Sequence, residues 1–348
     1  MDLLERIARL TAAAGATGME DAVAAEVAAQ LTELGVEVFR DKAGSVYGKI
    51  GEGHPLVLLM AHMDEVGMVV QKVEENGMLR LCKIAGVDPR ILPGSRLVIQ
   101  GREGPVWAVA GALPPHLKKE KEPPAYQWED ILCDTGLAAE EAGRLIRPGD
   151  MVTLAPEPPL NLLSGRASGK TMDDRAPLAA LIELFARLGD EELSCTVVLC
   201  ASVQEEKSGA GAMAGAHNLC PDMAIAVDVC HAPPPDTPFR TYPLEEVVLC
   251  RSASLHPGLF TLLESSAKAM RIPYQVEAAM AAKGTDAWDM AVQASGVATG
   301  LISVPLRYMH TGVEVLSLET LANMQKLLTG FLRGLKTGPW EEALCWRD

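Results

Sequence analysis

The sequence predicts an α/β protein with a mostly parallel sheet, covered by helices on both faces, into which a small β-barrel domain is inserted. Short apolar runs typical of buried strands alternate with amphipathic helical segments before residue 65 and after residue 165. Between these segments the pattern changes to short alternating stretches broken by turns. Hydrophobic residues make up 48% of the chain and aromatic residues only 4%, which indicates an aliphatic α/β core.

The first segment, residues 1–65, begins with two predicted helices. Apolar residues recur at helical spacing in 3–10 and again in 23–34, where Gly35 is expected to end the second helix. Three strands are then expected, at 36–39, 45–50 and 56–60. This opening is α/β in character.

Residues 66–164 predict the inserted β-barrel. They contain no convincing amphipathic helix apart from a short one near 138–145. Proline-rich connectors separate alternating apolar stretches at 68–73, 78–81, 96–100, 106–109 and 151–154. Because the insertion lies between two α/β segments, the larger domain is discontinuous and comprises residues 1–65 and 165–348.

The α/β alternation returns after Arg175. Pro177 is expected near the first turn of a helix that continues to Leu188. Further strands are predicted at 194–203, 223–229 and 297–303, and further helices from Gly209, from Pro257, at 286–294 and at 321–335. Strands that alternate with helices imply a mostly parallel sheet with helices on both faces.

Length, charge and cysteine content limit the classes of function. The chain has 348 residues and a formal net charge of −15, which argues against nucleic acid or an anionic membrane as a partner. No apolar run approaches the length of a membrane span, and the first residues lack a basic region followed by an apolar core. The 8 cysteines are scattered and form no Cys-x-x-Cys motif. We therefore expect a cytoplasmic protein with reduced cysteines.

Charged residues and histidines follow the ends of the predicted strands. The strand at 194–203 leads into the adjacent carboxylates of Glu205 and Glu206, which repel each other unless a cation lies nearby. The strand at 56–60 leads to His62 and Asp64, whose i, i+2 spacing places both side chains on one side of the chain. There Asp64 is able to hold the second ring nitrogen of a metal-bound His62.

Three further loci have the same character. Asp228 ends one strand, His310 follows another within a few residues, and Asp173 and Asp174 precede a helix. Sites in open α/β sheets form at the carboxyl ends of the strands, so all these residues are positioned to converge. Histidines and carboxylates together suit a pair of divalent ions. The spacing alone does not choose between Asp173 and Asp174, and Arg175 is expected to pair with a nearby carboxylate such as Asp174.

Six motifs carry a resemblance that spans nearly the whole chain. In order, they are Ala61–Gly67, Gly169–Arg175, Gln204–Glu206, Ala226–Val229, Gly284–Ala287 and Pro305–His310. The set resembles the tetrahedral, dodecameric aminopeptidases, the glutamyl and deblocking aminopeptidase family of two-metal peptidases. The resemblance implies a metallopeptidase domain in residues 1–65 and 165–348, with the insertion serving assembly.

The resemblance also implies a set of metal ligands. His62 and Asp228 hold one ion, Glu206 and His310 hold the other, and Asp173 bridges both. We expect two divalent ions per subunit, zinc or cobalt, with a hydroxide shared between them as the nucleophile.

Other roles follow from the same resemblance. Glu205 is expected to act as the general base, taking a proton from the attacking water and passing it to the leaving amine. Asp64 completes the catalytic residues. The peptide bond between Asp173 and Asp174 is expected to be cis.

Residues of the substrate pocket are expected beside the ligands. Lys207 directly follows Glu206 and is a candidate cation for binding acidic N-terminal residues; the alternatives are Lys283 and Arg251. His231 is placed to line the pocket, and the family match gives Asp286 a supporting role. The sequence departs from the family pattern near the site at Lys207–Ser208, at Pro177 and at 245–252.

We therefore expect a two-metal aminopeptidase that removes N-terminal residues from short peptides. Self-association is expected through the insertion, which we place apart from the ligands, with a dimer as the building block and a dodecamer implied by the resemblance. Two alternatives stay open. Some relatives are labelled endoglucanases, although a glycosidase needs two carboxylates and no histidine pair. A non-catalytic peptide- or metal-binding assembly is the other, if the departures disable the pocket.

Overall fold

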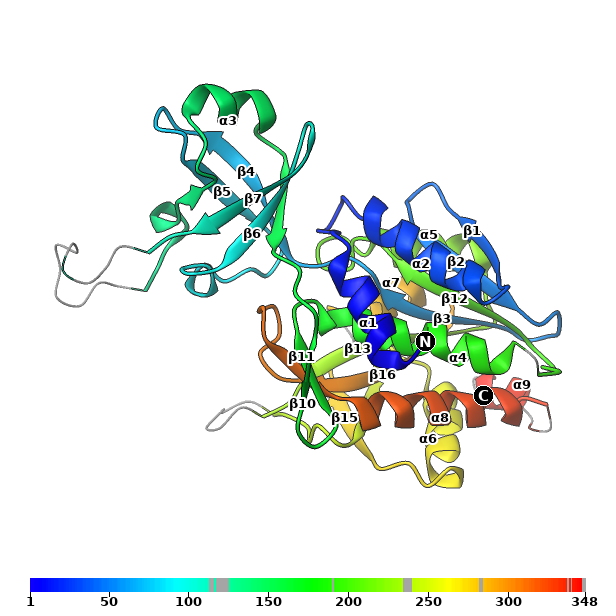
Figure 1. Cartoon of the computed structure of the whole chain (residues 1–348). Helices are drawn as coiled ribbons and strands as arrows, with labels where there is room; N and C mark the ends of the chain where they lie inside the picture. The colour runs from blue at the N-terminus through cyan, green and yellow to red at the C-terminus, as the bar shows by residue number, and fades with distance from the viewer. Residues whose placement is uncertain are drawn as a thin grey trace.

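The computed structural model describes residues 1–112, 116, 125–189, 191–233, 240–281, 284–336, 338 and 340–345. Figure 1 shows a β-barrel at one end and a larger α/β part that contains both chain termini. None of the helices in these described ranges is both long enough and apolar enough to cross a membrane.

An eight-stranded sheet forms the larger part, in the order β1-β2-β12-β3-β13-β16-β14-β15. The four central strands run parallel to one another: β12 (Thr196–Ser202), β3 (Leu56–His62), β13 (Met223–His231) and β16 (Ala298–Leu306). The outer strands are β1 (Glu37–Arg40), β2 (Val46–Ile50), β14 (Val247–Ser252) and β15 (Tyr274–Ala279). Antiparallel pairs join β1 to β2, β2 to β12, and β14 to β16. The mostly parallel sheet is confirmed, but β14 and β15 were not predicted.

Helices cover both faces of this sheet, as predicted. One face packs against α1 (Leu3–Ala12), α2 (Asp21–Glu33), α4 (Met172–Leu188), α6 (Pro257–Ala269) and α8 (Leu318–Gly334). The other packs against α5 (Ala210–Leu219) and α7 (Asp286–Ala291). A short helix, α9 (Trp340–Leu344), lies against α6 and was not predicted.

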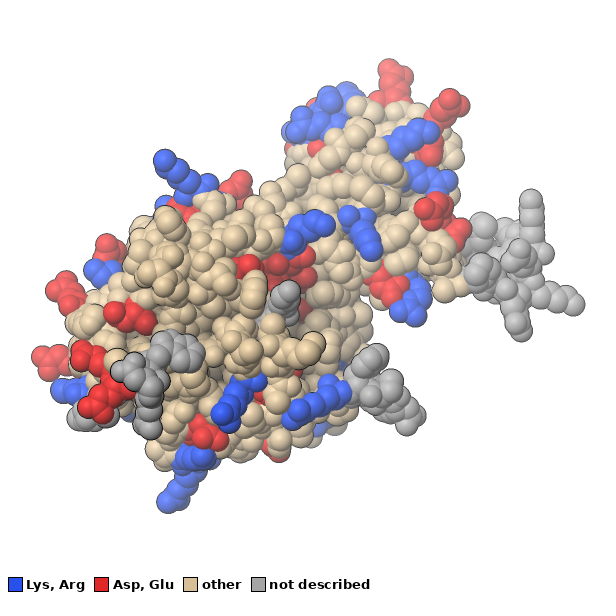
Figure 2. All heavy atoms as spheres, turned by 180° about the vertical axis from the view of Figure 1, so that it is seen from behind, with Lys and Arg blue, Asp and Glu red and all other residues tan. Residues whose placement is uncertain are grey.

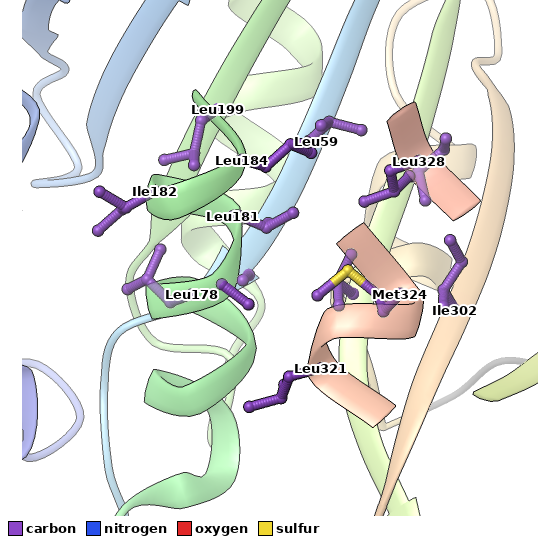
Figure 3. Close-up of a cluster of buried hydrophobic side chains, with 14 of the residues drawn as sticks. Leu59, Leu178, Leu181, Ile182, Leu184, Leu199, Ile302, Leu321, Met324 and Leu328 are labelled. Atoms are coloured by element: carbon purple, nitrogen blue, oxygen red, sulfur yellow. The ribbon is translucent and has the colours of Figure 1, made fainter. Parts of the chain in front are cut away.

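The largest hydrophobic core lies beneath α4 and α8. Figure 3 shows side chains of the two helices converging with those of β3, β12 and β16, the labelled residues being Leu59, Leu178, Leu181, Ile182, Leu184, Leu199, Ile302, Leu321, Met324 and Leu328. All of these are fully buried, and burial of one such side chain contributes about 1.5–3 kcal/mol relative to exposure. This core fixes α4 on the sheet, and the non-helical backbone of Asp173 and Asp174 lies at its N-terminal end.

The barrel closes in the order β4-β5-β8-β7-β6-β9. Its strands are β4 (Gly67–Val73), β5 (Leu79–Ile84), β6 (Arg96–Gly101), β7 (Gly104–Ala110), β8 (Cys133–Asp134) and β9 (Met151–Leu154). In the part of this region that the structure describes, the α-helix α3 (Ala139–Leu145) and the 3-10 helices η1 (Pro89–Ile91) and η3 (Trp128–Asp130) lie between the strands. All these elements fall within residues 66–164, the range predicted for the insertion.

A small sheet lies where the barrel joins the larger part. It contains β10 (Leu160–Leu162), β11 (Arg166–Gly169) and β17 (Glu314–Ser317), none of which was predicted. Gly169 at the end of β11 lies opposite Glu314 at the start of β17. This pairing brings the segment that leads to Asp173 next to the segment that follows His310.

Candidate active site

His62 and Asp64 lie side by side at the end of β3, as predicted from their spacing. Nδ1 of His62 is 3.5 Å from Oδ1 of Asp64, and the backbone carbonyl oxygen of Asp64 is closer, at 3.2 Å. Both side chains are buried. The Asp64 carboxylate also accepts a hydrogen bond of 2.7 Å from the Thr17 hydroxyl. The ring of His62 is therefore oriented through Nδ1, which leaves Nε2 facing the site.

The same carboxylate holds the loop that follows β12. The backbone N–H groups of Glu205 and Glu206 donate to the two oxygens of Asp64, at 3.1 and 3.3 Å. Gln204 has a left-handed backbone, with φ of 60°, and its N–H donates to the buried Glu20 carboxylate. Asp64 thus fixes the adjacent carboxylates and His62 in one arrangement.

Asp173 lies between the two histidines. Its Oδ1 is 3.1 Å from Nε2 of His62, and its Oδ2 is 3.3 Å from Nε2 of His310. Nε2 of His310 is also 3.1 Å from Oε1 of Glu206. Each oxygen of one buried carboxylate therefore faces a different imidazole. The peptide bond from Asp173 to Asp174 is cis, which confirms the expectation from the resemblance.

Asp174 and Asp228 complete the cluster on the His62 side. Ligand atoms of His62, Asp174 and Asp228 all lie within 4.8 Å of one another, and so do those of His62, Asp173 and Glu206. Asp174 accepts a 3.2 Å hydrogen bond from the backbone N–H of His62 through Oδ2, while its buried Oδ1 has no hydrogen-bond partner.

The cluster concentrates negative charge in a buried place. Burial, the nearby Asp228 carboxylate and other acids raise the pKa of Glu205 to about 10, although His62 opposes them. Burial also raises the pKa values of Asp174 and Asp228 well above their ordinary value. Burial on its own lowers the pKa of His310. The hydrogen bonds to Asp173 and Glu206 together outweigh this effect and raise the pKa to about 11. Even with both histidines protonated, the carboxyl groups of the cluster outnumber its cationic groups.

These residues fit a pair of divalent cations. Buried carboxylates that are paired neither with a base nor with a full set of hydrogen bonds are unfavourable, and divalent ions supply the missing charge. The orphaned Oδ1 of Asp174 points to the same need. Imidazole nitrogen and carboxylate oxygen are the ligands that zinc takes in hydrolytic sites.

Sequence reasoning missed a residue that links Asp173 to His310. Glu314 is buried, and its carboxylate accepts hydrogen bonds from the backbone N–H groups of His310, at 2.7 Å, and Asp173, at 3.2 Å. Its only sequence signal is its position four residues after His310 in the same loop region.

Arg175 pairs with a nearby carboxylate, as expected, but its partner is Glu65 and not Asp174. The fully buried guanidinium donates to the Glu65 carboxylate at 3.1 Å, and Lys170 donates to the other oxygen of Glu65 at 2.5 Å. Arg175 also donates to the backbone carbonyls of Leu10, Ala13 and Met63. It therefore ties α1 to the end of β3 and stays outside the acidic cluster.

The predicted pocket residues occupy different environments. Lys207 and His231 are exposed, one after Glu206 and the other at the end of β13. Asp286 is buried and accepts a hydrogen bond from Ser202, the residue opposite His62 in the β12·β3 pair. Arg251 stacks over Phe260, and Lys283 lies outside the described residues.

The site opens at the junction between barrel and larger part. A cavity lined by Asp173, Glu206, His310 and Glu314 also borders Val66 and Leu154, where the chain enters and leaves the barrel. A second cavity, of 470 Å³, lies between the His310 loop and barrel residues that include Gly86 and Arg90. Figure 2 shows acidic side chains gathered in the hollow between the two parts, flanked by basic ones. The expectation that the insertion lies apart from the ligands is therefore wrong.

Comparison with known proteins identifies the family. The profile of the M42 glutamyl aminopeptidases matches residues 44–327. The chain belongs to the M42 peptidase family. It is accordingly a metal-dependent aminopeptidase, which hydrolyses peptide bonds. The lysyl aminopeptidase of Pyrococcus furiosus is 34% identical over 314 residues, covering 88% of this chain and 89% of that protein.

Solved structures of M42 relatives share the whole fold. A TET aminopeptidase from the marine sediment archaeon Thaumarchaeota archaeon SCGC AB-539-E09 is 29% identical with a TM-score of 0.89, covering 98% of this chain and 99% of that one. TET1 peptidase of Pyrococcus horikoshii, which can assemble into a tetrahedron or a large octahedral shell, is 29% identical with a TM-score of 0.85, covering 95% and 99%. A Thermotoga maritima structure described as an endoglucanase is 25% identical with a TM-score of 0.77, covering 97% and 99%.

Proposed function

We propose that this M42 peptidase is a two-metal aminopeptidase acting on short peptides. The observation that carries the proposal is the position of Asp173, whose two carboxylate oxygens face the Nε2 atoms of two different histidines. A carboxylate in that position suits a bridge between two ions. When bound, such a pair of ions lowers the pKa of a shared water and polarises the scissile carbonyl.

We propose the ligand assignment that the resemblance of the sequence implies. His62 and Asp228 would hold one ion and Glu206 and His310 the other, with Asp173 between them. Asp174 also lies in ligand range of His62 and Asp228. However, Oδ2 of Asp174 accepts a hydrogen bond from the backbone N–H of His62, whereas the two oxygens of Asp173 face both histidines. These contacts favour Asp173 as the bridge. Zinc or cobalt would suit the donor set.

Glu205 is the residue we propose as general base. Its carboxylate Oε2 lies 3.9 Å from Nε2 of His62, and its backbone is fixed by Asp64. Burial raises its pKa to about 10 in the absence of cations, and positive charge nearby lowers the pKa of a carboxyl group. With both positions filled, Glu205 would titrate in the range useful for taking a proton from the attacking water and giving it to the leaving amine.

Chelation tests the proposed function. We expect removal of metal to abolish peptide hydrolysis and to lower the melting temperature, because an ion bound only by the folded state stabilises it by mass action. Zinc or cobalt should restore both, with two ions per subunit. Hydrolysis of glucan in place of peptide would favour the endoglucanase alternative, and metal binding without either activity would favour a non-catalytic assembly.

We also propose self-association through the barrel. Trp107 and Val109 on β7 are 58% and 47% exposed, and their i, i+2 spacing puts both on the outer surface. Exposed apolar surface of this kind marks an interface, and the TET1 relative forms large shells. Leu97 and Ile99 on the neighbouring strand β6 are buried in the barrel core and add nothing to this surface. A dimer through β7 would be the building block of a dodecamer.

Changing Trp107 to glutamate is therefore expected to reduce the assembly. A carboxylate at the centre of an apolar contact costs several kcal/mol when desolvated without a partner. Light scattering at micromolar concentration should show a mass at least twofold lower than that of the wild type. Met280→Glu is the matched control, since Met280 is 94% exposed on the larger part. An unchanged mass in Trp107→Glu would place the contact elsewhere.

Specificity for acidic N-terminal residues is proposed to come from Lys207. The family model is that of glutamyl aminopeptidases, but one relative is a lysyl aminopeptidase. Because family membership does not decide the preferred N-terminal residue, the proposal rests on the side chains of this chain. Lys207 is exposed directly after Glu206. We expect Glu-peptides to be favoured at low salt, with the preference weakening as salt screens the pair.

Lys207→Met should shift the ratio of kcat/KM toward Leu-peptides by about tenfold, the effect of roughly 1.4 kcal/mol. Lys336→Met is the control, because Lys336 is an exposed lysine two residues beyond the end of α8. The same Glu-to-Leu ratio in wild type and Lys207→Met would assign Lys207 to the solvent.

The eight cysteines are all free, which supports activity in the reducing cytoplasm.

A further inference from the structure

His310 is held in an uncommon backbone conformation. Its φ is 63°, in the left-handed region that few residues with a side chain adopt. The Glu314 carboxylate accepts its backbone N–H at 2.7 Å. Nε2 faces Asp173 and Glu206. These contacts fix the main chain and the Nε2 edge of the ring. The rotation of the imidazole therefore depends on the contacts of its opposite edge.

That other edge lies against the barrel. A Cβ atom built on Gly86 would lie 2.4 Å from Nδ1 and 2.8 Å from Cε1 of His310. Both distances are shorter than any van der Waals contact, so the bare glycine backbone is what lets the ring occupy its position. No positive φ requires glycine at this position. The requirement comes from the ring of His310.

The segment that carries Gly86 is anchored on both sides. Before it, Ile84 at the end of β5 pairs with Gly67 at the start of β4. After it, the Asp88 side chain accepts the backbone N–H of Arg90 and begins η1. Because this segment is held on both sides, it does not move easily to make room for an added methyl group. A larger residue at position 86 would therefore displace the ring of His310.

We propose that Gly86 is a positioning residue for His310. The barrel would thereby complete the metal site, since its backbone forms the surface that fixes the imidazole toward Asp173 and Glu206. This inference rests on the proposed two-metal function for its consequence, because the ion held by Glu206 and His310 would depend on the barrel while the ion held by His62 and Asp228 would not.

Gly86→Ala tests the consequence. We expect one of two zinc ions to bind at least tenfold more weakly in competition with a chromophoric chelator, while the other keeps its wild-type affinity. Gly143→Ala is the matched control in the same domain, because a Cβ at Gly143 meets nothing within 4 Å. Wild-type affinity for both ions in Gly86→Ala would overturn the proposal.

A double-mutant cycle in the metal-free protein tests the contact itself. Gly86→Ala is expected to lower the melting temperature of the wild type but not that of His310→Ala, where no ring remains to be displaced. If Gly86→Ala fails to fold, the double variant should fold. An equal loss in both backgrounds would make Gly86 a packing residue only and overturn the proposal. Should the wild type bind fewer than two ions, the proposed function fails, and the cycle still decides the contact.

Discussion

Asp173→Asn is expected to remove both metal ions and nearly all peptidase activity. An amide has one acceptor oxygen, so it is unable to serve two ions through two carboxylate oxygens, and its nitrogen would face one of the two histidines that Asp173 now contacts. The loss of charge at the bridge removes several kcal/mol of transition-state stabilisation, or more than about 10³-fold in turnover. Turnover and elemental analysis of the purified protein measure the two effects.

Asp222→Asn is the control for this change. The carboxylate of Asp222 accepts the backbone N–H of Leu56 at the opposite end of β3 from His62. It carries the same change in charge without touching the acidic cluster, and should keep both ions. If Asp173→Asn also retained two ions, the bridge would have to be assigned to Asp174, the neighbour that the sequence left as an alternative.

Glu205→Gln has the second largest expected effect. It should lose about 10²–10⁴ in turnover, the range for a general base, while keeping two ions per subunit. The metals remain because neither histidine depends on Glu205: its closest approach is 3.9 Å, to His62. Single-turnover kinetics and metal analysis on one preparation separate loss of chemistry from loss of metal.

Glu183→Gln provides the comparison, ten residues along α4 from Asp173. The half-buried Glu183 pairs with Arg187, one helical turn away, and accepts a hydrogen bond from Gln325, so it does not touch the acidic cluster. Near wild-type turnover is expected for this variant. Wild-type turnover in Glu205→Gln would show that another group accepts the proton, and loss of metal in the same variant would make Glu205 a ligand.

The proposed ligand set was accessible from sequence because buried parallel strands have a strong signal. Met223 to Asp228 and Leu56 to His62 are apolar runs that end in a candidate metal ligand, and the rule that sites form at carboxyl strand ends brings these candidates together. His310 lies in a loop shortly after β16, so its position made it a candidate, and the resemblance gave it the role of a ligand. The choice between Asp173 and Asp174 likewise depends on backbone geometry that spacing does not encode.

Other features were missed for physical reasons. The edge strand β15 has no fully buried position, so Tyr274–Ala279 shows no period-2 pattern of burial. Glu314 and Gly86 matter through their contacts with His310, and the periodicity of β-strands in the sequence does not reveal such contacts. Gly86 in particular carries no chemistry of its own, and its importance appears only when the ring of His310 is placed beside it.

The insertion of the barrel also sets the order in which the chain can fold as it is made. Strand β3 is synthesised early, yet its parallel partner β12 begins roughly 140 residues later, since Thr196 pairs with Leu56. At ribosomal rates of about 5–20 residues per second, β3 waits roughly 7–28 s with its apolar side chains unpaired. The hairpins β4·β5 and β6·β7 join strands close in sequence, and such local pairs form first. The barrel can therefore close while β3 still lacks both of its partner strands, β12 and β13.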